Sequence, residues 1–231
     1  MDSAFDYEYT IFSNSYSLPL SDSSNKTKEQ ILLIATVSFA KYGYASVSMR
    51  DLAKVMGIQQ SSLYNHFASK EALWKEVLEH ASSMYMLYFN HLNEVIEKAG
   101  SFEEVLEAIF YEPKRLVNVF SSYAFCMIQA EQFRDERAGA IFEETFLGYS
   151  IDFIQGWFEQ CVAKGMVQPF DTKTVACVVM HSVLIGLDVQ VHRHLNHPYS
   201  PPYDARKMFS DLQRFILQAV AVRQKSDEPG V

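Results

Sequence analysis

The apolar positions of the chain recur at the 3.6-residue period of an α-helix, and no stretch shows the alternation of a strand. The first such face, made by Ile31, Ala35 and Phe39, predicts a helix over about 27–42. No proline occurs over residues 20–112, and prolines interrupt helix interiors. The sequence therefore predicts an all-α fold.

Two further short helices and one long helix are predicted next. Ser48 begins a capping box, so a second helix is expected from there to about Gly57. A third short helix is predicted over about 60–66. Ser69 is a suitable N-cap for a fourth helix over about 70–98.

The same periodicity predicts six more helices towards the C-terminus. Pro113 suits the first turn of a helix, where its missing N–H leaves no hydrogen bond unmade. Gly165 is expected to end one helix and Asp171 to cap the next. The predicted ranges are about 102–112, 113–119, 121–135, 138–164, 171–194 and 204–224.

The net charge of −8 is distributed unevenly along the chain. Residues 1–25 carry −4, residues 26–70 carry +4 and residues 71–231 carry −8. A basic segment between acidic ones is typical of a nucleic-acid-binding unit attached to another domain, although +4 is a common charge for a segment of this length.

Composition narrows the class of protein. An apolar content of 48% is typical of a folded globular chain. We find neither a secretory signal nor 18 uninterrupted apolar residues, so we expect a cytoplasmic protein that does not contact a membrane. The three cysteines lack the paired spacing of a zinc site and are expected to be free thiols.

Three short helices with a glycine at the turn after the second form the geometry that inserts a recognition helix into the major groove of DNA. Residues 57–73, GIQQSSLYNHFASKEAL, resemble the N-terminal signature of the TetR family of one-component regulators. The resemblance covers about residues 28–75. It implies a long fourth helix followed by a divergent helical domain for ligand binding and dimerisation. Upstream residues that also fit the pattern are Phe39, Gly43, Ser48, Leu52 and Ala53.

The third helix and its surroundings supply candidates for reading base edges. Glutamine and asparagine pair bidentately with adenine, and serine contacts several bases. Leu63 and Phe67 are instead expected in the core. A solvated polar residue is the alternative for each candidate, and a phosphate contact or a pair with Asp51 is a further one for Arg50. The predicted base-reading residues are Gln59, Gln60, Ser61, Asn65 and Arg50.

A second group is expected to contact the DNA backbone and to fix position rather than sequence. The resemblance implies that Tyr64 faces DNA and that Lys70 binds a phosphate; a surface tyrosine is the alternative for Tyr64. Two departures stand out: Gln59 is a poor N-cap, and the arm before the domain is acidic. The predicted backbone contacts are Ser48, Ser62, Tyr64, His66, Lys70 and Lys28.

The predicted helices over 138–164 and 171–194 are too apolar to be explained inside one small domain. The resemblance implies that they pair with their symmetry mates in a homodimer. Two recognition helices would then lie one DNA turn apart, roughly 34–36 Å, on a near-palindromic operator. The predicted interface residues are Phe142, Tyr149, Ile154, Phe158, Val179, Val183 and Leu187.

The region between is rich in aromatic residues and methionine. Singly these residues are more commonly core, but 17 Phe and 13 Tyr together favour an adaptable apolar cavity for a hydrophobic or aromatic effector. The resemblance implies that the effector shifts the fourth helix and so changes the separation of the recognition helices. The predicted lining residues are Met84, Tyr88, Phe120, Tyr123, Met127, Phe146, Phe153, Trp157 and His181.

A histidine-rich segment leaves three alternatives open: a metal site, a polar pocket or interface contact, and ordinary histidines near a helix end. We predict neither a metal nor a cofactor. The segment contains His181, Asp188, His192, His194 and His197.

We therefore predict a flexible acidic arm at 1–25, a helix-turn-helix domain at 26–75, a ligand-binding and dimerisation domain at 76–225, and a tail at 226–231. The leading hypothesis is a ligand-released repressor acting on double-stranded DNA. The alternative is a helical DNA-associated scaffold with non-specific binding. No catalytic triad, Cys-His pair or phosphate-binding glycine loop suggests an enzyme.

Overall fold

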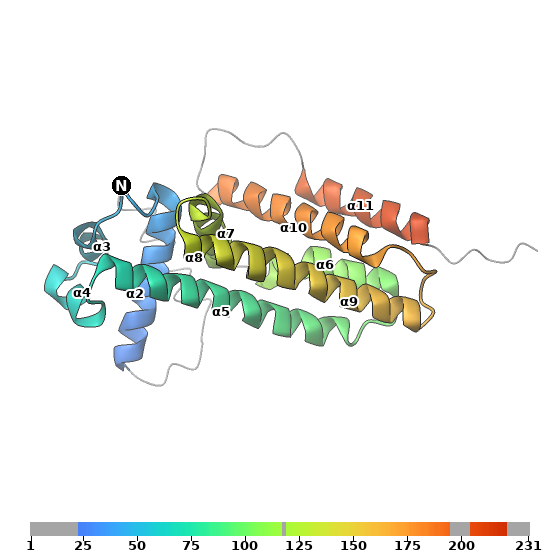
Figure 1. The fold of residues 1–231 in the computed structure, drawn as a ribbon, viewed down its shortest axis with the longest axis horizontal. Helices are drawn as coiled ribbons and strands as arrows, with labels where there is room; N and C mark the ends of the chain where they lie inside the picture. The colour runs from blue at the N-terminus through green and yellow to red at the C-terminus, as the bar shows by residue number, and fades with distance from the viewer. Residues whose placement is uncertain (1–22, 117–118, 195–203, 221–231) are drawn as a thin grey trace, which may run out of the picture.

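The computed structural model describes residues 23–116, 119–194 and 204–220, and over these ranges every regular element is a helix (Figure 1), as the sequence predicted. Of these residues, the side chains of 23–27, 112–116, 119–122, 190–194 and 205 are not described. The elements are α2 (Ser23–Tyr42), α3 (Met49–Val55), α4 (Gln60–His66), α5 (Lys70–Ile96), α6 (Phe102–Leu116), α7 (Val119–Glu131), α8 (Glu136–Ala140), the π-helix η1 (Ile141–Tyr149), α9 (Ser150–Ala163), α10 (Thr172–His194) and α11 (Ala205–Val220).

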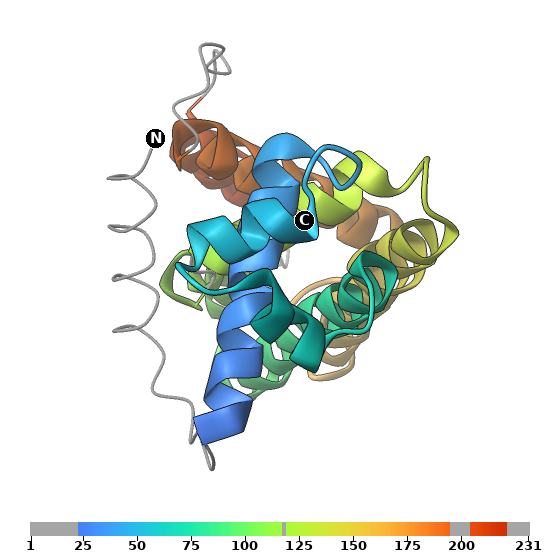
Figure 2. The same ribbon diagram turned by 90° about the vertical axis from the view of Figure 1, so that its left-hand side faces the viewer.

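The helices are arranged as a small cap on a longer bundle. Helices α2, α3 and α4 lie at one end of the molecule, and α5 runs from that end along the bundle of α6, α9, α10 and α11 (Figure 1). Figure 2 looks onto the cap, with α2 crossing the end of the bundle. Helix α2 packs on α7 as well as on α5, so the cap has two points of attachment.

Local sequence signals account for most helix ends in the cap. The Ser48 side chain accepts a hydrogen bond from the Asp51 N–H, and the Asp51 carboxylate accepts from the Ser48 N–H, which is the predicted capping box. Ser69 caps α5 by accepting from the Ala72 N–H, also as predicted. Gly57 has φ of +65°, a conformation that glycine adopts without a steric penalty.

Two predicted boundaries are wrong. Helix α6 continues through Pro113 to Leu116, whereas separate helices were expected on either side of that proline. Because proline has no N–H, the helix continues there without the i→i−4 hydrogen bond that position 113 would otherwise donate to the carbonyl of Ile109. The helix predicted over 138–164 begins at Glu136, after the N-cap Asp135, and its middle part is the π-helix η1.

One hydrophobic core extends through both the cap and the bundle. It contains Ile31, Leu63 and Phe67 from the cap together with Phe110 and Phe158 from the bundle. The boundary predicted at residue 75 therefore falls within a helix that belongs to this common core. Burial of apolar surface is the main favourable term in folding, so cap and bundle stabilise one another.

One stretch of α10, residues 172–189, is long and apolar enough to suit a membrane span by length and composition. The same helix packs against α9, α7 and α11. A helix that is apolar on several sides needs apolar partners on those sides, and here the bundle supplies them. The bundle covers part of this apolar stretch, while Val178 and Ile185 remain exposed.

Candidate nucleic-acid interface

Helix α4 directs its apolar side chain into the core and exposes most of its polar ones. Leu63 is 0% exposed and Phe67, just after the helix, is 1% exposed, as the sequence predicted. The polar side chains of the helix lie on the opposite side, and Tyr64 is 46% exposed. The exposed candidates for DNA contact on this side are Gln59, Gln60, Ser61, Tyr64 and Asn65.

The turn between α3 and α4 sets the direction of this exposed row. Gly57 donates its N–H to Lys54, and Ile58 donates to Ala53 at 3.0 Å, which closes the C-terminal end of α3. Gln59 stands at the N-cap of α4 but makes no side-chain capping bond. As the sequence indicated, the amino end of α4 is poorly capped, and the N–H groups of its first turn lack a side-chain partner there.

Arg50 and Ser48 lie on the neighbouring helix. Arg50 is exposed and makes no ion pair within the described part of the chain. Its alternative partner Asp51 is bound to Ser48, whose hydrogen bonds hold the pKa of the carboxyl below its usual value. The Ser48 hydroxyl is itself engaged in this capping box, so a phosphate contact from it would compete with the cap.

The two lysines predicted to bind phosphate are held by the chain itself. The ammonium group of Lys70 donates to the carbonyl of Tyr44 and lies 4.1 Å from the centre of the Tyr44 ring. Burial lowers the pKa of Lys70, while the nearby carboxylate of Glu131 raises it in part. Lys28 forms an ion pair with Glu76. Both lysines therefore carry internal contacts that a phosphate would have to replace.

The remaining backbone candidates are half-buried. Ser62 lies on α4 beside the core-facing side of that helix. The ring of His66 packs beside that of Phe67, with the centroids 6.5 Å apart. These two residues border the exposed row of α4 and are less accessible than Tyr64 or Asn65.

Beneath the cap lies a polar network that the sequence did not predict. The buried Glu131 accepts the N–H of Tyr44 at 3.0 Å, and Tyr44 donates its hydroxyl to Glu71 at 3.2 Å. Arg137 bridges Glu71 and Asp135, at 2.7 and 2.9 Å. The one available signal was the aspartate at position 135, a residue type that favours N-caps, but the sequence placed it at the end of a predicted helix over 121–135, whereas α7 ends at Glu131.

The predicted lining residues do not meet around one cavity. Tyr123, Met127 and Phe146 are buried in packed core, and Trp157 is nearly so. His181 is exposed and its Nδ1 lies 2.7 Å from the carbonyl of Cys177, so it faces away from the interior. The Phe120 side chain lies outside the described residues, and Met84 and Phe153 are half-buried.

A small apolar cavity does lie in the bundle. Of the described residues predicted to line a pocket, only Tyr88 lines this cavity. Three residues predicted for the dimer interface also line it: Ile154, Val183 and Leu187. Its volume is about 30 Å³, which is room for about one water molecule. A drug-sized effector would have to displace side chains to enter. The cavity is lined by Tyr85, Tyr88, Phe89, Leu92, Ile109, Ile154, Met180, Val183 and Leu187.

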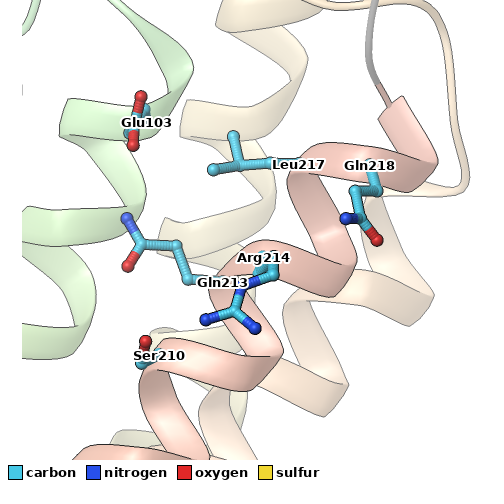
Figure 3. A pocket seen from close by; sticks show the side chains of 6 residues that line it. All are labelled: Glu103, Ser210, Gln213, Arg214, Leu217 and Gln218. Atoms are coloured by element: carbon cyan, nitrogen blue, oxygen red, sulfur yellow. The ribbon is translucent and has the colours of Figure 1, made fainter.

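A larger hollow of about 400 Å³ opens between α6 and α11 (Figure 3). Its lining carries both signs of charge, with Glu103 on one helix and Arg214 on the other. It differs in chemistry from the apolar cavity that the sequence predicted. The other lining residues are Ser210, Gln213, Leu217 and Gln218.

Four of the residues predicted to form a dimer interface are buried within the chain itself. They pack in the common core, so their side chains do not reach the surface that a second copy would meet: Ile154, Phe158, Val179 and Leu187. Phe142 and Val183 are half-buried, and Tyr149 is exposed. Over residues 172–189 of α10, the large apolar side chains that are exposed are Val178 and Ile185.

The histidine-rich segment shows no group of metal-binding side chains within the described residues. His181 and Asp188 are described, whereas the side chains of His192 and His194 are not, and His197 lies outside the described ranges. The three cysteines are free, and burial raises the pKa of Cys126 to about 12, which keeps that thiol protonated.

Comparison with known proteins places the cap in a family. Residues 31–77 match the family model described as bacterial regulatory proteins, tetR family. The HTH-type transcriptional repressor KstR2 of Rhodococcus jostii is 40% identical over 62 residues, which cover 26% of this chain and 30% of that protein. The chain thus spans about a third of the length of this relative.

Two further proteins resemble most of the chain. The nucleoid occlusion factor SlmA of Vibrio atlanticus is 26% identical over 188 residues, covering 79% of this chain and 92% of that protein. The solved structure of a TetR-family transcriptional regulator from Cytophaga hutchinsonii shares the fold, with a TM-score of 0.65, 15% identity and coverage of 89% of this chain and all of that one. Residues 31–77 thus carry the N-terminal region of the tetR family of bacterial regulatory proteins, and the chain shares its overall fold with a solved TetR-family regulator.

Proposed function

We propose that this protein is a DNA-binding transcriptional regulator and that α4 is its recognition helix. The observation that carries the proposal is the exposed polar row of α4 above the buried anchors Leu63 and Phe67. Such a helix can enter the major groove without unfolding, because the residues that hold it and the residues that would read bases are separate. Gln60 and Asn65 are the best placed to pair with adenine.

Repression on a near-palindromic operator is the proposed mode of action. Support comes from KstR2, which is described as a transcriptional repressor and resembles the cap. We propose that two copies associate through apolar side chains that α10 and η1 expose, namely Val178, Ile185 and Tyr149. A two-fold dimer would present two copies of α4 to successive turns of one face of the DNA.

Release by a hydrophobic or aromatic small molecule is the proposed control. The apolar cavity beside Tyr85 is the candidate site, because its lining is made almost entirely of aliphatic and aromatic side chains. At about 30 Å³ it is too small for a drug-sized molecule, so the effector would select or create a wider state of the bundle.

A second candidate function is a DNA-associated scaffold that needs no effector. Two observations favour it: the small volume of the cavity, and the likeness to the nucleoid occlusion factor SlmA over most of the chain. The two functions differ in sequence specificity, and in whether a small molecule changes DNA binding.

The test compares binding to a palindromic fragment of the protein's own promoter with binding to random DNA of equal length, by fluorescence anisotropy over a salt series. A specific regulator prefers the palindrome at every salt concentration, whereas equal affinity for the two DNAs would contradict the proposal. Gln60→Ala should weaken the palindrome complex by about 1–3 kcal/mol and the random complex much less. Gln160→Ala, exposed on α9, is the matched control and should bind like the wild type.

A further inference from the structure

A continuous helix of residues 136–163 joins the cap to the neighbourhood of the small cavity. It consists of α8, η1 and α9, which follow one another without a break, and we call it the long composite helix. It lies beside α5 in the bundle (Figure 1). Its start makes a hydrogen bond to Trp74, and its middle contacts Tyr85 of the cavity wall.

At its start, the long composite helix is attached to the core of the cap. The N-cap Asp135 accepts the N–H groups of Arg137 and Ala138 and also the indole Nε1–H of Trp74, at 3.0 Å. The Trp74 ring is fully buried, with centroids 4.7 Å from Tyr44 and 5.5 Å from Phe39 of α2. A shift of this helix start therefore acts directly on the aromatic core that supports α2.

The Asp135 carboxylate is held in its charged form. Burial alone would raise its pKa, but hydrogen bonds from Arg137, Ala138 and Trp74 outweigh that effect and lower it. A charged acceptor makes a stronger hydrogen bond to an indole N–H than a neutral one does. The link to Trp74 is thus a firm contact rather than an incidental one.

In its middle, the long composite helix is attached to a wall of the cavity. Tyr85, which lines the cavity, stacks on Phe146 of η1 with the ring centroids 4.0 Å apart. Its hydroxyl hydrogen-bonds to Ser150 at 2.9 Å, at the start of α9. The Phe146 contact falls where the helix is π-helical, a geometry that is rare and frequently found at functional sites, and the Ser150 contact follows directly after it.

We propose that the long composite helix transmits the state of the cavity to the cap, with Asp135 as the positioning residue; this rests on the proposed function. Any occupant larger than a water molecule must displace part of the lining, and Tyr85 is the lining residue bound to η1 and α9. Displacement of Tyr85 moves Phe146 and Ser150, and the long composite helix shifts with them. The hydrogen bond between Asp135 and the Trp74 indole N–H then changes. The altered packing of Trp74 on Phe39 and Tyr44 reorients the cap relative to its partner copy.

The test uses a larger side chain in the cavity wall in place of the unidentified effector. Val183 and Val175 are both half-buried on α10, but of the two only Val183 lines the cavity. Trp74 is observed by fluorescence after Trp157, the other tryptophan of the chain, is replaced by phenylalanine. Val183→Phe should shift the Trp74 emission maximum to longer wavelength, and Val175→Phe should leave it unchanged.

An unchanged maximum in a folded Val183→Phe protein, or an equal shift in both variants, would overturn the proposal. Circular dichroism checks folding, and Val183→Leu is the gentler variant if the phenylalanine prevents it. Palindrome affinity is the second readout. Val183→Phe should lower it roughly 5- to 150-fold, and Trp74→Phe, which removes the indole donor but keeps an aromatic ring, should diminish that effect.

The two readouts separate the two proposals. If the wild type binds palindromic and random DNA equally, the proposed function fails, but the Trp74 emission still decides whether the cavity and the cap are coupled. In a second case, Val183→Phe leaves the emission unchanged and lowers the palindrome affinity by the same factor in the wild-type background and in the Trp74→Phe background. The proposed function then stands. The coupling would then run through the direct contact of α7 with α2 instead.

Discussion

The recognition end and the bundle use their side chains in opposite ways. In and directly after α4, the apolar residues Leu63 and Phe67 face the core, whereas most of the polar residues face solvent. The burial of a residue here follows from whether it is apolar or polar. In the bundle the aromatic residues pack against one another: Phe89, for example, contacts the rings of Tyr85, Tyr149 and Phe153. The space left between them is about 30 Å³.

This difference explains why the exposure of the DNA-contact candidates followed from the sequence, whereas the lining of the cavity did not. The helical period decides whether a polar residue of a short surface helix faces solvent, so DNA-contact candidates follow from spacing. An aromatic residue in a bundle can line a cavity, fill one or form an interface, and spacing does not distinguish these roles. Tyr85, the residue that connects the cavity to η1, was absent from the predicted pocket for this reason.

The largest expected effect tests whether the two regions fold together. Leu63→Ala should reduce the free energy of unfolding by about 2–5 kcal/mol, because it removes a fully buried side chain and leaves a cavity. Urea unfolding followed by circular dichroism and by tryptophan fluorescence should show one transition that shifts in both signals. Leu87→Ala, on the exposed side of α5, should change stability by no more than about 0.5 kcal/mol.

Two resolved transitions, of which Leu63→Ala moves only the first, would show that the cap and the bundle are independent. The continuous core described above would then contribute little across the boundary.

The next effect concerns function rather than stability. Asn65→Ala should weaken binding to the palindromic promoter fragment by about 1–3 kcal/mol while leaving the free energy of unfolding nearly unchanged. The reason is that Asn65 is exposed on α4 and contributes little to the core. Anisotropy titrations on palindromic and random DNA measure it, with Asn90→Ala on the exposed side of α5 as control. Equal losses of affinity for the two DNAs would indicate that Asn65 contacts the DNA backbone instead of a base.

A pH-dependent effect is expected in the bundle. Burial lowers the pKa of His80 below its ordinary 6.5, so the unfolded chain binds the proton more readily than the folded one. Stability is therefore full above about pH 6.5 and falls as the pH drops towards the folded-state pKa, by at most about 1.4 kcal/mol per pH unit.

His80→Gln should flatten this dependence when urea unfolding is measured between pH 7.5 and pH 5. His91→Gln, exposed on the same helix, should retain the wild-type slope. An identical slope for the wild type and His80→Gln would remove His80 from the explanation of acid sensitivity.

The smallest expected effect sharpens the role of Gln59. Gln59→Ser should stabilise the protein by about 0.5–1 kcal/mol, because serine can accept a backbone N–H that no side chain caps now. Thermal unfolding measures the gain, and Gln168→Ser in an exposed loop should give none. A gain in stability together with weaker binding to the palindrome would support a base-reading role for Gln59. Unchanged binding would leave it as a cap position alone.

Sequence alone determined the all-α fold, the three short helices of the cap and most of their ends. These features depend on local interactions: a capping box at Ser48, an N-cap at Ser69, and glycine at position 57 where φ is positive. Leu63 and Phe67 were also assigned correctly to the core, since their spacing places them on one face of a single helix. Such properties span a few residues, which is the range over which a linear pattern carries information.

Only the tertiary structure decided how distant elements meet. Helix α2 packs on α7, and Trp74 donates a hydrogen bond to Asp135, which is 61 positions away in the sequence. The side chains of Ile154 and Phe158, which were predicted for a dimer interface, are buried in the chain's own core. The lysines expected at phosphates are bound to Tyr44 and Glu76. The physical reason is that the helical period specifies which face of a helix is apolar, but not which helix will cover it.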